Sequence, residues 1–166
     1  MLNPEQLADR AAITDQIYNY ARAVDRLDAE LGYAVWHADG TADYGTDNYV
    51  GSGHGFIDHV IPQHAAMLSH AHHMSNIQIR LDGDRAGSET YVLAVLHMDQ
   101  GGEYSRILVN ARYLDRWSRR EGRWAIDHRI AVMDCADVQA VHPLTLHKCG
   151  ARDRTDESYA VLSAPF

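Results

Sequence analysis

Two side chains in the first half of the sequence have types and positions suited to proton transfer. Asp25 lies at the edge of the apolar stripe of a predicted helix, and His73 lies on the apolar side of a predicted strand. A carboxylate beside an imidazole fixes the tautomer of the ring and raises its basicity. If the helix packs on the strand, Asp25 and His73 form a general base. The alternative is a surface Asp25 paired with Arg22 or Arg26, with His73 as an ordinary core residue.

Two tyrosines and an arginine could assist such a base. Tyr20 precedes Asp25 by five residues in the same helix, and Tyr44 lies in a glycine-containing stretch. A phenol can donate to an oxygen that gains negative charge, or can protonate a leaving hydroxyl. Each tyrosine could equally be an aromatic core residue. Either His128 or Arg129 points into the domain, and an inward Arg129 would need an acid, for which Asp25 is available.

The histidines raise the alternative of a metal site, because the chain has eleven of them and six lie between His54 and His73. His70 and His72 share one side of a strand and could bind zinc with a third ligand. Three others step by five residues and miss the i,i+4 spacing of a helical metal pair, namely His54, His59 and His64. We therefore expect no metal and no other cofactor.

The elements that must position these residues follow from hydrophobic periodicity. An apolar stripe at spacings of three and four predicts a helix over residues 4–31, in which a kink or a second helix begins near residue 29. A loop with short strands follows, then a helix over residues 56–68. The second half predicts four antiparallel strands, over residues 73–81, 88–98, 104–119 and 124–134. This order indicates an α+β domain with helices on one face of a curved sheet.

Length and composition place the chain in one acidic domain. It has 166 residues, 46% of them hydrophobic, and its 15 Lys and Arg against 23 Asp and Glu give a net charge of −8. We expect the domain to span residues 1–135 and residues 136–166 to form a tail within it or at a subunit interface. The charge excludes nucleic acid as a partner, because such binding relies on basic residues.

Cysteine content and apolar runs indicate the surroundings of the chain. Cys135 and Cys149 are too few for a disulfide framework, and we expect both to be plain thiols. A membrane-spanning helix needs about 18 or more consecutive apolar residues. Since the sequence has no such run, we expect a cytoplasmic protein without a membrane partner.

Both sides of the later predicted strands are apolar. Val92, Ala94 and Leu96 alternate with Leu93 and Val95. A sheet covered by helices on one side is polar on the other unless that side is covered as well. We therefore expect the chain to form a homo-oligomer.

Four segments together resemble a known superfamily: residues 17–25, 72–76, 113–117 and 124–129. The chain is similar over residues 5–134 to the NTF2-like, SnoaL-like domains. The resemblance implies an α+β cone, also called cystatin-like, in which N-terminal helices pack on a strongly curved antiparallel or mixed sheet and enclose a pocket. Such a fold alone is compatible with many functions.

Within this superfamily the chain looks most like a lyase branch that contains scytalone dehydratase, hexachlorocyclohexane dehydrochlorinase and bile acid 7α-dehydratase. Asp25 and His73 match the Asp and His pair that this branch uses as its base, and Arg129 matches an arginine of the dehydrochlorinase site. Tyr20 and Tyr44 occupy the places of two tyrosines in the bile acid enzyme. The dehydrochlorinase has a lysine where this chain has Tyr20, which favours loss of an oxygen leaving group over loss of chloride. The resemblance also implies a trimer formed through the outer sheet face.

These observations predict a cofactor-independent lyase for a hydrophobic hydroxylated substrate, aromatic or steroid-like in size. The reaction would be a dehydration, or a retro-aldol cleavage that releases a small aldehyde, in the catabolism of aromatic compounds. The alternatives are an isomerase for a similar substrate and a small-molecule-binding module without catalysis.

Overall fold

The computed structural model of the protein describes residues 2–142 and 150–163. In these residues the elements follow in the order α1 (Pro4–Asp25), α2 (Ala29–Ala34), β1 (Trp36–Asp43), β2 (Val50–Ser52), α3 (Gly53–Ala65), β3 (Ser69–Asp82), β4 (Arg85–Asp99), β5 (Tyr104–Arg120), β6 (Arg123–Ala140) and α4 (Glu157–Ser163).

The first helix begins with a capping box. The side chain of Asn3 accepts a hydrogen bond from the backbone of Gln6, whose own side chain accepts one from the Asn3 backbone. The expected stripe is buried, and it includes Ile13, Ile17, Tyr20 and Val24. The second helix expected near residue 29 is present as α2, and Leu27, with a φ of 54°, turns the chain between α1 and α2. Asp25 is consequently the last residue of α1.

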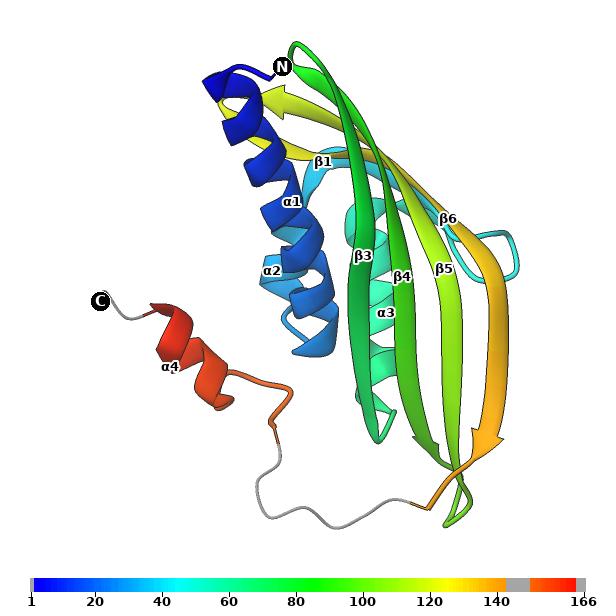
Figure 1. The fold of residues 1–166 in the computed structure, drawn as a ribbon. Coiled ribbons are helices and arrows are strands. Elements are labelled where there is room, and N and C mark those ends of the chain that lie inside the picture. The colour runs from blue at the N-terminus through cyan, green and yellow to red at the C-terminus, as the bar shows by residue number, and fades with distance from the viewer. Residues whose placement is uncertain (1, 143–149, 164–166) are drawn as a thin grey trace.

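The strands form one sheet in the order β2-β1-β6-β5-β4-β3. Strand β1 pairs with β6 in parallel, and the other neighbours pair antiparallel. Helix α1 contacts both β3 and β6, and α3 contacts β1 and α1. Figure 1 shows α3 behind the sheet, with α1 beside β3. The expected α+β fold is confirmed, with a sheet that curls around the helices without closing.

The core lies between the helices and the inner face of the sheet. On β5 the buried residues alternate along the strand: Ala111, Tyr113, Asp115 and Trp117. The largest fully buried side chains come from β1, α1, β5 and β6 and include Trp36, Tyr20, Trp117 and Arg129. Charged and phenolic groups are thus part of this core.

A bulge in β3 decides which histidines face the core. Ser75 pairs with Tyr91 and Gln78 pairs with Glu89, so two residues of β3 stand opposite one residue of β4. Asn76 lies in the bulge with a φ of 48°. Because one extra residue exchanges the two faces of a strand, the residues before the bulge take the opposite alternation from those after it.

The chain continues beyond the sheet as a segment that returns to α1. Strand β6 extends to Ala140, six residues further than expected. Tyr159 Oη donates to Asp28 at 2.9 Å, and Arg22 donates to Ser158 at 3.2 Å. Residues 150–163 therefore pack at the carboxyl end of α1.

The structure also bears on the expectations about the thiols and about membrane-spanning helices. Cys135 is a free, exposed thiol, whereas Cys149 lies outside the described residues. Among the helices described, none is both long and apolar enough to cross a membrane.

Candidate functional site

The carboxylate at the end of α1 is bound by one residue of β3. Asp25 Oδ1 lies 2.7 Å from Nδ1 of His72, and Asp25 Oδ2 accepts the backbone N–H of His72 at 2.9 Å. The two side chains are shielded, with exposed fractions of 16% for Asp25 and 6% for His72. A carboxylate at a helix carboxyl end is disfavoured by the helix dipole, so the two hydrogen bonds from His72 compensate for this position.

The acceptor character of the carboxylate assigns the tautomer of His72. An ionised carboxylate can only accept, so Nδ1 carries the proton and Nε2 keeps its lone pair. In the described part of the chain Nε2 of His72 has no hydrogen-bond partner. The geometry is therefore that of a histidine general base oriented by an aspartate.

The partner of Asp25 is His72 and not His73, which corrects the pairing expected from the sequence. His73 was placed on the side of Ile77 and Ile79 by counting alternate residues. The β3 bulge lies between His73 and these isoleucines and exchanges the two faces of the strand. His72 therefore faces inward, and His73 is exposed on the outer face.

Two more imidazoles stand beside His72. His64, from α3, has its ring centroid 5.4 Å from that of His72 and 4.6 Å from that of His70. His70 Nε2 lies 2.9 Å from the carbonyl of Val24, and its Nδ1 lies 3.3 Å from an Arg152 nitrogen that donates to it. Burial lowers the pKa of His70, so a neutral His70 serves as a cap for the carboxyl end of α1.

A phenol pair lies further along the inner face. Tyr20 Oη and Tyr44 Oη are 2.9 Å apart, and Arg129 Nη1 donates to Tyr44 Oη at 3.4 Å. Tyr113 packs edge-on against Tyr20, and Phe56 stacks on Tyr44 with centroids 3.7 Å apart. The structure thus brings together three residues that the sequence named as candidates, Tyr20, Tyr44 and Arg129.

The acid that binds Arg129 is Asp115 and not Asp25, which is a second correction. Arg129 Nε and Nη2 donate to the two carboxylate oxygens of Asp115 at 2.7 and 2.8 Å. Both side chains are 0% exposed. A second bulge, at Asp127 in β6, turns Arg129 inward opposite β5, where Asp115 alternates with buried aromatic residues. The long-range pairing of β5 and β6 decides this contact.

Electrostatics keep this part of the site in a defined protonation state. Burial opposes the charge of Arg129, but the carboxylate of Asp115 raises the pKa of Arg129 well above its ordinary value. Burial, together with Tyr113 and Tyr44, raises the pKa of Tyr20 well above its ordinary value, and burial also raises the pKa of Tyr44. Both phenols are therefore protonated donors at neutral pH.

The phenols form a small hydrogen-bonded network with Arg129. Tyr44 Oη accepts from Arg129, and one phenolic proton serves the bond between Tyr20 and Tyr44. The hydroxyl of Tyr113 is a third member of this network, as a hydrogen-bonding neighbour of both Tyr20 and Tyr44. The inner face therefore carries a group of protonated phenols, a kind of donor that can stabilise negative charge on an oxygen.

The base and the phenol pair lie at different heights along α1. Tyr20 and Asp25 are five residues apart on α1, which is a rise of about 7.5 Å. The inner face of the sheet beside them is apolar. His72 pairs with Ala94 of β4, which pairs with Val109 of β5, and Met74 is followed across the sheet in the same way by Val92 and Ala111.

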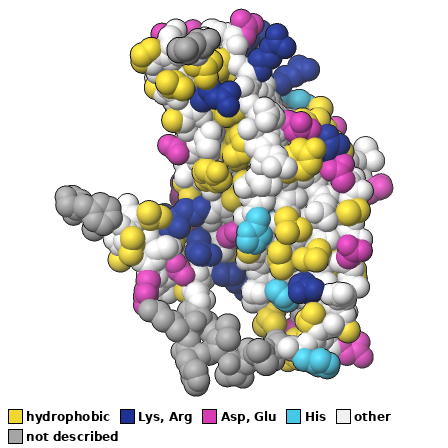
Figure 2. Space-filling view, in the orientation of Figure 1, with side chains coloured by type: hydrophobic (Ala, Val, Ile, Leu, Met, Phe, Trp, Pro, Cys, Tyr) yellow, Lys and Arg dark blue, Asp and Glu magenta, His cyan; other side chains and the backbone are white. Residues whose placement is uncertain are grey.

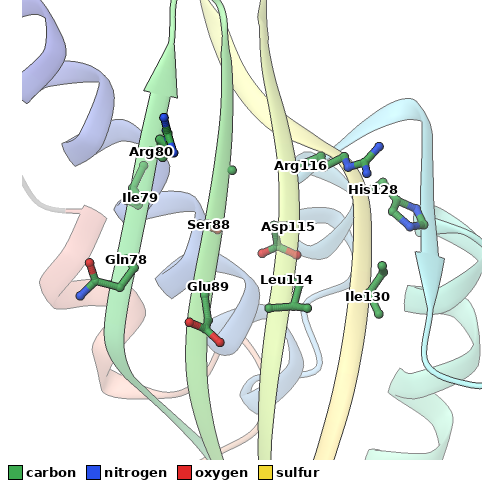
Figure 3. A pocket seen from close by; sticks show the side chains of 11 residues that line it. Gln78, Ile79, Arg80, Ser88, Glu89, Leu114, Asp115, Arg116, His128 and Ile130 are labelled. Atoms are coloured by element: carbon green, nitrogen blue, oxygen red, sulfur yellow. The ribbon is translucent and has the colours of Figure 1, made fainter.

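A groove of about 520 Å³ lies on the outer face of the sheet, opposite the helices (Figure 3). Its side chains come from the outward positions of β3, β4, β5 and β6 and include Arg80, Glu89, Leu114, Arg116 and His128. Since Asp25 and His72 face the inner side, this groove is separate from the candidate base.

A metal centre is not supported by the geometry of the described residues, in which no group of three or more His, Cys, Asp or Glu is arranged to hold an ion. His70, which the sequence suggested as a ligand, uses its two nitrogens for Val24 and Arg152.

Sequence reasoning missed three residues of the site. His64 follows Phe56 and Val60 at intervals of four, which places all three on one side of α3. Asp115 lies between Tyr113 and Trp117 on alternate positions of one strand. Both signals were readable from periodicity, whereas the choice of His72 depended on a bulge.

Comparison with known proteins gives the family. The profile of the SnoaL-like domain matches residues 5–130. A search of curated proteins found no match.

Three solved structures share the fold. The LinA-type3 hexachlorocyclohexane dehydrochlorinase from Novosphingobium barchaimii is 22% identical, with a TM-score of 0.72 over 84% of this chain and 97% of that one. A scytalone dehydratase-like protein from Novosphingobium aromaticivorans is 20% identical, with a TM-score of 0.66 over 86% of this chain and 97% of that one. The Kfla4162 protein from Kribbella flavida is 19% identical, with a TM-score of 0.70 over 78% and 93%.

At such low identities the solved structures support the fold alone. The profile match, which covers most of the chain, supports membership of the family. The match over residues 5–130, in a chain whose helices lie on one face of a curled mixed sheet, shows that this chain belongs to the SnoaL-like domain family.

Proposed function

We propose that the protein is a lyase that needs no cofactor and acts on a hydrophobic, hydroxylated aromatic or steroid-like substrate. The observation that carries the proposal is the 2.7 Å contact of Asp25 with Nδ1 of His72, which leaves Nε2, unpaired among residues 2–142 and 150–163, to accept a proton. Family membership and the fold of dehydrochlorinase and dehydratase neighbours are consistent with elimination chemistry.

His72 acts as the base in the first half of the reaction. Nε2 takes a proton from a carbon next to an activating carbonyl or phenol, and the electron pair of that C–H bond moves toward the activating group. The imidazolium that forms is stabilised by the carboxylate of Asp25. This step places negative charge on the oxygen of the activating group.

The phenol pair stabilises the charge that develops. The hydroxyl of Tyr20 or Tyr44 donates a hydrogen bond to the activating oxygen, and Arg129 polarises the pair through Tyr44. In a dehydration the C–O bond then breaks, a C=C bond forms, and the departing hydroxide takes a proton from the imidazolium or the phenol and leaves as water. A retro-aldol cleavage uses the same groups. His72 removes a hydroxyl proton, the oxygen forms the C=O of an aldehyde as the C–C bond breaks, and the electron pair of that bond moves toward the activating group. The imidazolium then returns the proton to the carbon that is left.

The matched experiment compares two neighbouring histidines. His72→Asn should lower kcat on a panel of hydroxylated aromatic ketones and steroids by about 10³-fold, because a positioned base contributes about 10² to 10⁴-fold. His73→Asn, whose side chain is on the outer face, should stay within about twofold of wild type. Equal losses in the two variants, or a loss with His73→Asn alone, would contradict the assignment.

The same assay separates the alternatives. An isomerase is a second candidate because a base and a phenol donor on one substrate also suit the shift of a double bond. It gives a product of unchanged mass, whereas a dehydratase gives a product lighter by one water. Binding of a substrate without any turnover would favour a module without catalysis.

We further propose that the protein is a cytoplasmic homotrimer that works in the catabolism of aromatic compounds and associates through the outer sheet face. That face carries exposed apolar side chains, among them Tyr91 and Ile130, both from the four central strands. Figure 2 shows hydrophobic patches among charged side chains over the sheet. In this arrangement the domain expected over residues 1–135 continues to the end of β6 at Ala140, and the chain after it forms the tail. Light scattering should give three times the monomer mass, and Ile130→Lys should lower it.

A further inference from the structure

His64 is a buried polar residue in the site to which the base and the phenols assign no role. It lies at the carboxyl end of α3, eight residues after Phe56, which stacks on Tyr44. Its ring lies 5.4 Å from that of His72, with an angle of 28° between the planes. The side of α3 that contacts the phenol pair at one end thus contacts the base at the other.

The ring of His64 lacks a partner that its burial would require. His64 is 7% exposed, and in the described part of the chain its Nδ1 is buried without a hydrogen bond. A buried, unsatisfied polar atom destabilises a protein, and most buried polar atoms are paired. The neighbouring His70 differs, since both of its nitrogens have partners.

His64 is also held in its neutral form. Burial, and then the imidazoles of His72 and His70, lower the pKa of His64 to about 3. A neutral imidazole has one donor and one acceptor nitrogen. His64 therefore adds hydrogen-bonding capacity beside His72 without adding a charge that would lower the basicity of the base.

We propose that His64 is a specificity-determining residue whose Nδ1 hydrogen-bonds a hydroxyl of the substrate beside the carbon that His72 deprotonates. The inference rests on the proposed function for the position of the substrate. It assigns a substrate class with two oxygen functions, a carbonyl or phenol at Tyr20 and Tyr44 and a separate hydroxyl at His64. An unpaired nitrogen in the free protein then has a partner in the complex.

The experiment uses four probes that differ by one hydroxyl: acetophenone and its 2-, 3- and 4-hydroxy isomers. Dissociation constants are measured by calorimetry for wild type, His64→Leu and His64→Gln. The control is His59→Leu, the same substitution at a histidine of α3 whose ring lies within hydrogen-bond distance of Asn48 and Gln63 instead. Because leucine fills the site without a polar atom, His64→Leu should fold and raise Tm by about 2 to 4 °C.

Wild type is expected to bind at least one hydroxy isomer about tenfold tighter than acetophenone. His64→Leu should abolish this preference while changing the affinity for acetophenone less than twofold, His64→Gln should keep part of it, and His59→Leu should keep all of it. A preference that persists in His64→Leu overturns the inference. So does a wild type that binds all four probes equally or binds none, and in those cases the comparison of His72→Asn with His73→Asn still decides the lyase proposal by itself.

Discussion

The two ends of the site are built in different ways. At the base end, two hydrogen bonds join His72 and Asp25, and their side chains are shielded from solvent without being fully buried. Within the described ranges, Nε2 of His72 has no hydrogen-bond partner. At the phenol end, Arg129 and Asp115 are completely buried and every polar atom of the ion pair is engaged with a defined neighbour.

This difference makes the phenol end the more rigid of the two. The base end can lose a hydrogen bond without exposing the core, because its groups already approach solvent. The phenol end cannot, because an unpaired charge in the core destabilises the fold strongly. The same change of aspartate to asparagine should therefore lower mainly the activity at Asp25 and mainly the stability at Asp115.

The largest expected effect is on activity, at Asp25. In Asp25→Asn the amide can donate to Nδ1 of His72, which moves the ring proton to Nε2 and removes the base. We expect kcat to fall by about 10³ to 10⁴-fold, with a free energy of unfolding within about 1 kcal/mol of wild type. Steady-state kinetics and urea denaturation check this, and an active variant would contradict the tautomer assignment.

Asp115→Asn should act mainly on stability. Removing one partner of a buried ion pair costs about 3 to 5 kcal/mol, since Arg129 keeps its charge in the core. Urea denaturation measures the loss. The double variant Asp115→Leu with Arg129→Met should recover stability without activity. A single variant as stable as wild type would show that the ion pair does not hold this end together.

The phenol pair should show a smaller and graded effect. Tyr20→Phe should lower kcat by about 10²-fold, as loss of a donor to a developing oxyanion does. Tyr44→Phe should do the same and also destabilise the fold by about 1 to 2 kcal/mol, because Arg129 Nη1 loses its acceptor. Kinetics and thermal melting of both variants measure the split. Unchanged kcat in both would remove the phenols from the mechanism.

The smallest effect concerns pH and His64. The pKa of His64 is lowered from 6.5 to about 3 in the folded chain, so the unfolded chain binds its proton more readily. The free energy of unfolding should then fall as the pH drops from about 6.5 toward 3, by up to about 1.4 kcal/mol per pH unit from this group.

His64→Leu should flatten this acid limb, whereas His59→Leu should leave it closer to wild type. Urea denaturation at pH 7, 6, 5 and 4 gives the slopes. If His64→Leu keeps the full slope, another group is responsible for it.

Local features of the sequence were enough for the elements and for part of the site. The stripe that includes Ile13 and Ile17 predicted α1, and its edge placed Asp25 toward the sheet. The strands of the second half were predicted from alternation and glycine turns, and the α+β class followed. These signals depend on neighbours a few residues away, so the sequence contains them directly.

The contacts between distant segments were decided only by the tertiary structure. Counting alternate residues selected His73, but the bulge at Asn76 reverses the faces of β3 and brings His72 to Asp25. Likewise the pairing of β5 with β6 gives Arg129 to Asp115. A single extra residue in a strand changes the side of every residue beyond it, and the partner strand, far away in the sequence, determines where that residue is accommodated.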